Sequence, residues 1–168
     1  SLAAIDQAER AIAPTDANAN RIKWNLSVLR VQNFIAQGLA AEADAELTRT
    51  EKLEQLVFGS TLFSRALKGE ALVWLGDYET AVKELTLVAM SVETYRLPTS
   101  YSAPPTNVPE LFYYSTAQLR AYTSLSAQYL LREKFDEALK WSERAETLYA
   151  DVFFVAGHFL YGRYMTVH

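Results

Sequence analysis

Apolar residues along this chain recur at helical spacing in paired runs, and a short polar turn joins the two runs of each pair. In the clearest pair, residues 66–75 and 78–89 are the two runs, and Gly76 and Asp77 are the turn. Glycine suits the left-handed backbone conformation that often ends a helix, and aspartate can cap the helix that follows. The pattern predicts two antiparallel helices joined by a tight turn.

Two further stretches of the chain carry the same turn. Aligning Gly38, Gly76 and Glu133 puts an alanine at the same place in each following run, namely Ala43, Ala81 and Ala138. Such a small side chain lets two helix backbones approach closely, while Tyr78 fills the space beside the second turn. Ala40 and Phe135 take the place of Tyr78 in the other two copies. The pattern therefore predicts an all-α chain built from stacked antiparallel helical hairpins.

The hydrophobic periodicity and the helix-breaking residues predict one domain over residues 1–168 with seven or eight helices. Prolines at positions 98, 104, 105 and 109 predict a loop, which explains the longer spacing between the second and third turns. The predicted elements are an N-terminal helix at 2–13, hairpins at about 21–57, 61–94 and 110–149, a proline-rich loop at 96–109, and a C-terminal capping helix at 151–165.

The turns also resemble a known family. The segments LGDYETAVKEL, REKFDEALKWSERA and, more weakly, QGLAAEADAEL are similar to the second half of the tetratricopeptide repeat (TPR), in which an aromatic residue and then an alanine follow a glycine turn. The resemblance implies a short right-handed superhelix. The first half of the motif is poorly kept, because its aromatic start falls on Ser27, Arg65 and Tyr122 and its small residue on Val31, Gly69 and Ser126. The alternative is an all-helical bundle in which these turns recur by coincidence.

Composition narrows the classes of partner. The chain has 168 residues, half of them hydrophobic, no cysteine, and a net charge of −4. Lysines and arginines are scattered, so the sequence predicts no nucleic-acid binding.

The longest apolar run, at 152–162, is shorter than the roughly 18 residues of a membrane span. The chain begins at Ser1 without a leader, which suggests a trimmed polypeptide, and its compartment stays open between the cytoplasm and the periplasm or envelope.

No local motif predicts catalysis. The six glycines are all isolated, so no phosphate-binding loop is present, and the two histidines, His158 and His168, cannot form a local metal motif. Carboxylate pairs lie beside basic residues on predicted outer faces, which is typical of a solvated surface. We therefore expect no enzyme activity, no cofactor and no metal.

The TPR resemblance implies a concave inner surface, lined mainly by the first helix of each hairpin. We expect a peptide or helix to be gripped there by Phe63 and Trp74, while Glu70 and Arg120 set the polarity. The positions that the resemblance assigns to this surface are Asn25, Val28, Gln32, Phe63, Ala66, Glu70, Trp74, Arg120, Thr123 and Ala127. They lack the lysine, arginine and asparagine pattern of members that bind chaperone tails. The function this implies is a non-catalytic scaffold for protein–protein binding within a larger bacterial assembly.

Aromatic residues near the proline-rich loop form a second candidate surface, namely Tyr95, Tyr101, Phe112 and Tyr113. They either fill wide gaps between helices or recognise a partner. The apolar segment at 151–165 leaves a similar choice between a buried cap and the seam of a homodimer.

One alternative function comes from a second resemblance. The run LGDYETAVKELTLVAMSVETYRL is similar to the helical core of SusD-like glycan-binding components of outer-membrane uptake systems, in which aromatic residues stack on sugars. The likeness covers a single hairpin, and the much longer ligand-binding portion of that family is lacking.

Overall fold

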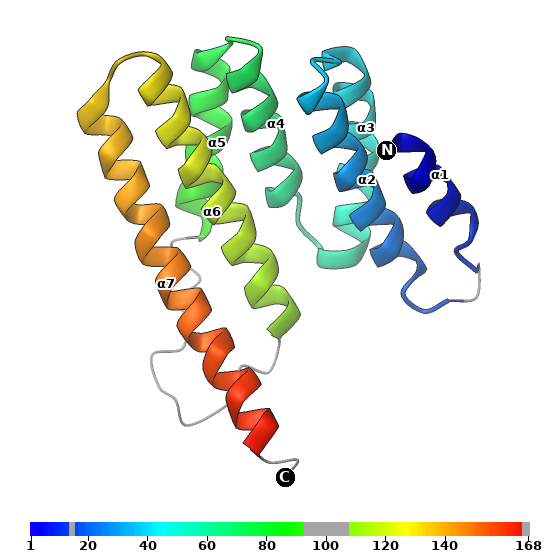
Figure 1. Cartoon of the computed structure of the whole chain (residues 1–168). Helices are drawn as coiled ribbons and strands as arrows, with labels where there is room; N and C mark the ends of the chain where they lie inside the picture. The colour runs from blue at the N-terminus through cyan, green and yellow to red at the C-terminus, as the bar shows by residue number, and fades with distance from the viewer. Residues whose placement is uncertain (14–15, 93–107, 166–168) are drawn as a thin grey trace.

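A computed structural model describes the backbone of residues 1–13, 16–92 and 108–165, and the side chains of 1–13, 16–91 and 113–150. These residues form seven helices and no strand. The helices are α1 (Leu2–Arg10), α2 (Ala19–Ala36), α3 (Ala40–Phe58), α4 (Leu62–Trp74), α5 (Tyr78–Val92), α6 (Val108–Leu131) and α7 (Phe135–Met165). The all-α prediction is confirmed, with α2/α3, α4/α5 and α6/α7 as antiparallel neighbouring pairs (Figure 1).

The three hairpin turns have the same backbone geometry and lie at the same end of the molecule (Figure 1). Gly38, Gly76 and Glu133 all have positive φ, at 71°, 81° and 58°. In the second turn the N–H of Gly76 donates to the carbonyl of Val73 at 3.1 Å, and the N–H of Asp77 donates to the carbonyl of Leu72 at 3.0 Å. Both bonds recur at the equivalent positions of the other two turns, so the helix carbonyls are satisfied in the same way each time.

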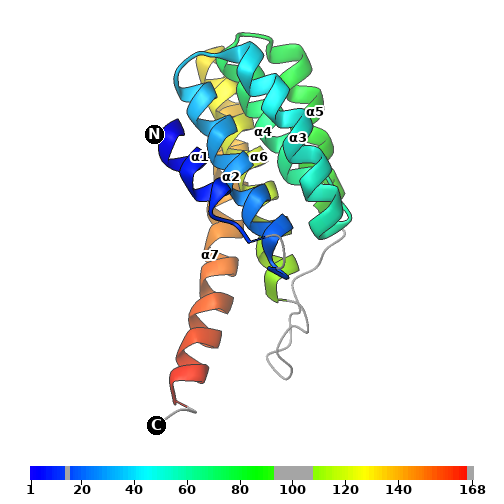
Figure 2. The same cartoon turned by 90° about the vertical axis from the view of Figure 1, so that its right-hand side faces the viewer.

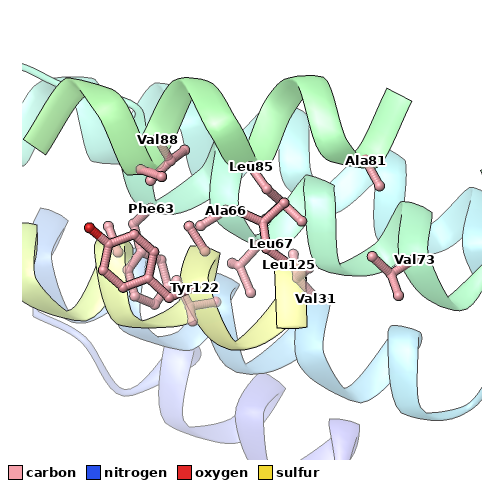
Figure 3. Close-up of a cluster of buried hydrophobic side chains, with 14 of the residues drawn as sticks. Val31, Phe63, Ala66, Leu67, Val73, Ala81, Leu85, Val88, Tyr122 and Leu125 are labelled. Atoms are coloured by element: carbon pink, nitrogen blue, oxygen red, sulfur yellow. The ribbon is translucent and has the colours of Figure 1, made fainter. Parts of the chain in front are cut away.

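Small residues set the separation of the paired helices. Ala43, Ala81 and Ala138 are all buried where each second helix meets the first. A Cβ on Gly69 would lie 2.5 Å from the side chain of Leu85, so the absence of a side chain there lets α4 and α5 approach closely. The central core lies where α4, α5 and α6 meet, and its labelled side chains converge in Figure 3.

The C-terminal part of the chain differs from the prediction. The helix expected at 151–165 is not separate, because α7 runs without a break from Phe135 to Met165. Residues 149–151 (Tyr, Ala, Asp) include neither glycine nor proline, so nothing in the local sequence ends the helix there. The last turns of α7 continue past the ends of the other helices (Figure 2). Helix α6 begins at Val108, two residues before the expected start of the third hairpin at about 110, and Pro109 lies in its first turn, where a missing N–H costs no helical hydrogen bond.

None of the helices within the described residues combines the length and the apolar character that a bilayer span requires. Most of the predicted loop at 96–109 lies outside the residues that the structure describes.

Candidate functional site

A hollow of about 200 Å³ opens between α4 and α6. Its wall is mostly apolar, and the residues that line it are Glu70, Val73, Trp74, Thr123, Ser124, Ala127 and Leu131. Val73 is buried, whereas Trp74 is 70% exposed. Tryptophan is enriched at protein-binding hot spots, so an exposed indole beside an apolar depression is a candidate contact residue.

Glu70 and Trp74 lie four residues apart on α4, which puts both side chains on one face of that helix. The carboxylate of Glu70 forms an ion pair with the guanidinium of Arg120 on α6, so this pair links the two helices beside the hollow. The guanidinium of Arg120 also lies over the ring of Phe63, with its carbon 5.3 Å from the ring centroid. Because the two charges offset each other, the site is close to electrically neutral.

The two hydroxyl side chains in the wall are those of Thr123 and Ser124. The Thr123 hydroxyl is within hydrogen-bond distance, 3.0 Å, of the carbonyls of Leu119 and Arg120 in its own helix. Ser124 is buried deeper in the same helix. The described lining therefore offers a ligand more apolar surface than directed polar groups.

Several residues expected on the concave surface do meet at this hollow. Glu70, Trp74, Thr123 and Ala127 line it, and Arg120 adjoins it through its ion pair with Glu70. Asn25 is exposed and Gln32 half-buried on α2, and neither lines the hollow.

Three other expected surface residues are buried, so their placement on the concave surface needs correction. Phe63 is only 6% exposed, and its ring packs edge-on against Trp24 with the centroids 5.4 Å apart. Val28 and Ala66 are also core residues, and Figure 3 shows Phe63 and Ala66 among the converging side chains. The family register places these positions on the first helix, but the neighbouring hairpin covers them. None of the three can contact a ligand on the surface of this structure.

Tyr113, from the second candidate surface, is also a core residue. Its ring stacks on Phe58 with the centroids 4.1 Å apart, and its hydroxyl donates to the buried carboxylate of Glu54. This position agrees with the interpretation that tyrosines fill gaps between helices. Tyr95, Tyr101 and the side chain of Phe112 lie outside the described residues.

Val73, Ser124 and Leu131 line the hollow but were not expected there. The turn alignment contains a signal for Leu131, because it takes the place of Trp74 in the third hairpin. Val73 and Ser124 form the deeper part of the wall, and only the packing of α4 against α6 shows this.

Among the described residues, no group of three or more His, Cys, Asp or Glu side chains could hold a metal ion. Comparison of the chain with protein-family models, with curated proteins and with solved structures gave no match.

Proposed function

We propose that this protein is a non-catalytic, TPR-like scaffold, and that the hollow between α4 and α6 binds a large apolar side chain of a peptide or helix from a protein partner. The observation that carries the proposal is the exposed Trp74 at the rim of an apolar hollow. The TPR-like assignment is supported by three turns that share one hydrogen-bond pattern and a positive φ, and by the buried alanine that follows each of them.

The size of the hollow suits a single side chain. A cavity of about 150 Å³ can hold a benzene molecule, so about 200 Å³ accommodates an aromatic ring or a leucine side chain. A buried apolar anchor next to an aromatic rim is how many peptide-binding surfaces obtain most of their affinity. The offsetting charges of Glu70 and Arg120 favour a neutral anchor over a charged one.

The exposed indole also supports a second candidate, a glycan-binding site of the SusD-like kind, because an aromatic ring can stack on a sugar. A sugar needs several directed hydrogen bonds as well. The mostly apolar wall and the internally bonded hydroxyl of Thr123 make this candidate the weaker one.

The test is a selection from a random peptide library displayed on phage, with the full chain as bait, followed by calorimetric titration of the selected peptides. We expect the peptides to share a large apolar residue, and Trp74→Ala to weaken their binding about tenfold or more. The matched control is Leu87→Ala, which removes a half-exposed apolar side chain from α5 and should leave the affinity unchanged.

Selected peptides that bind Trp74→Ala as tightly as the parent chain would contradict the assignment of the site. A panel of oligosaccharides titrated in parallel tests the second candidate. Saturable sugar binding that disappears in Trp74→Ala, together with no selected peptide, would favour the glycan function instead.

A further inference from the structure

The shared turn geometry makes positions in the last two hairpins directly comparable. Each residue of the α6/α7 turn lies 57 positions after its equivalent in the α4/α5 turn, because Glu133 takes the place of Gly76. Three apolar positions near the turns can be compared in this way, namely Val73 with Leu130, Tyr78 with Phe135, and Val82 with Leu139.

These equivalent positions differ in exposure. Val73 is 4% exposed, and Tyr78 and Val82 are partly buried against the core. Leu130, Phe135 and Leu139 are 56%, 64% and 59% exposed. The α6/α7 hairpin packs on the α4/α5 hairpin, whereas no described helix packs on the outer side of α6/α7 (Figure 1). We refer to Leu130, Phe135 and Leu139 together as the end face.

The residues that α6 and the turn after it present to α4/α5 indicate which kind of surface fits such a face. Ser124, Ala127 and Leu131 of α6 lie beside Val73 in the wall of the hollow. The guanidinium carbon of Arg132 lies 5.9 Å from the centroid of the Tyr78 ring. The covering helix α6 thus offers small residues and then a leucine, and the turn after it places a cation over the aromatic ring.

The end face is apolar only near the turn. Farther along α7, Ser142 takes the place of Leu85 and Glu146 takes the place of Ala89, and both replacements are exposed. A partner would therefore contact about two turns of α7. So small an apolar contact favours reversible binding over permanent association.

We propose that the end face binds an amphipathic helix of another polypeptide. In the bound state this helix lies alongside α6 as α6 lies alongside α4, with its small residues against Leu130 and Leu139 and a basic residue over the ring of Phe135. This site is distinct from the hollow between α4 and α6, and the proposal does not depend on the function proposed for that hollow.

The probe for this site is a synthetic peptide with the sequence of residues 115–134 of this chain, which includes the covering residues of α6. Fluorescence anisotropy would measure its binding to the full-length chain. We expect saturable binding that weakens about tenfold or more in a Phe135→Asp/Leu139→Asp variant. A peptide that carries alanine in place of Arg132 should also bind more weakly, because the cation over the ring is lost.

The matched control is Leu87→Asp/Met90→Asp, which places the same charges at exposed apolar positions of α5. Circular dichroism should show parental helix content in both variants. Absence of saturable binding would overturn the proposal. Equal binding to the parent chain and the end-face variant would also overturn it, and would indicate that the peptide displaces α6 from its own place beside α4. Sedimentation velocity tests the other occupant: a parental dimer that dissociates in the end-face variant would mean that a second copy covers the face.

Discussion

Glu54 is a fully buried carboxylate that joins three helices. From α3, it accepts hydrogen bonds from the backbone N–H groups of Phe63 and Ser64, both at 2.8 Å, at the start of α4. The hydroxyls of Ser64 and Tyr113 also donate to it. A carboxylate at a helix N-terminus satisfies N–H groups that have no partner within the helix and interacts favourably with the helix dipole. Glu54 therefore caps α4 from a neighbouring helix.

We predict that Glu54→Gln lowers the free energy of unfolding by about 1–3 kcal/mol. Each carboxylate oxygen receives one backbone N–H, so an amide at this position would direct its NH₂ group at one of those donors. Urea unfolding at neutral pH measures the change. Glu42→Gln, which alters an exposed carboxylate on the same helix, is the control and should have little effect. Equal stability of the two variants would contradict the capping role.

The same residue sets a pH dependence. Burial raises the pKa of Glu54 above its ordinary value of 4.5, and the hydrogen bonds it accepts offset only part of that rise. A raised folded-state pKa contributes stability that is complete below pH 4.5 and is lost as the pH rises through the folded-state pKa. The stability difference between the parent chain and Glu54→Gln should therefore grow as the pH falls from neutral toward 4.5.

Gln128 on α6 is the opposite case, a buried polar side chain for which the described residues supply no hydrogen-bond partner. It has no exposed surface, and neither its amide nitrogen nor its amide oxygen has a hydrogen-bond partner among the described residues. Such a group costs stability, because it gave up its bonds to water on folding and gained none in return.

We predict that Gln128→Leu raises the free energy of unfolding by about 1–2 kcal/mol, because leucine fills a similar volume without polar atoms. Gln118→Leu is the matched comparison on the same helix and should be destabilising, because the amide of Gln118 donates to the hydroxyl of Tyr122 at 2.7 Å. Thermal unfolding followed by circular dichroism measures both. Destabilisation of similar size in the two variants would contradict the prediction.

At the scale of elements, α1 is held to the rest of the molecule chiefly by charge. Ile5 is its buried residue. The guanidinium of Arg30 on α2 lies 2.7 Å from a carboxylate oxygen of Asp6 and 2.6 Å from one of Glu9, and Arg49 on α3 also pairs with Glu9. Arg30 is itself largely buried, so these pairs are screened less by salt than exposed ones.

We predict that Glu9→Gln releases α1 while the hairpins stay folded. Burial acts to raise the pKa of Glu9, but hydrogen bonds from Arg49 and Arg30 outweigh it, and the net pKa is lowered. The stabilisation by Glu9 is thus present above pH 4.5 and is lost as the pH falls through the folded-state pKa. Hydrogen exchange should show faster exchange of the α1 amides in Glu9→Gln, or in the parent chain at acid pH. Unchanged exchange in α1 would contradict this role of Glu9 and would show that Ile5 and the ion pair between Asp6 and Arg30 are sufficient to hold the helix.

The three hairpins differ mainly in what covers them. The same turn geometry recurs at Gly38, Gly76 and Glu133, yet the outer side of the third hairpin is exposed where that of the second is covered. The hollow between α4 and α6 follows from this stacking, because its two walls come from different hairpins. The hollow and the end face are therefore both properties of the whole array.

The amino-acid sequence by itself determined the helices and their turns. The patterns that predicted the antiparallel pairs and most helix ends depend on residues close together along the chain. They are the helical periodicity, the turns, and the alanine that follows each turn. Among the predicted helices, the separate one at 151–165 was wrong, because no local residue marks the expected break. Glu133 at positive φ shows that an equivalent turn can form without glycine, and the alignment with Gly76 was enough to find it.

Only the tertiary structure decided which side chains are accessible. Phe63, Tyr113 and Trp74 are all large aromatic residues on helices, but packing between hairpins buries the first two and leaves the third exposed. Exposure depends on residues from hairpins distant in sequence, and no periodicity within one helix encodes that contact. For the same reason the partners of Glu54, which come from α4 and α6, and the deeper wall of the hollow could not be predicted from the sequence.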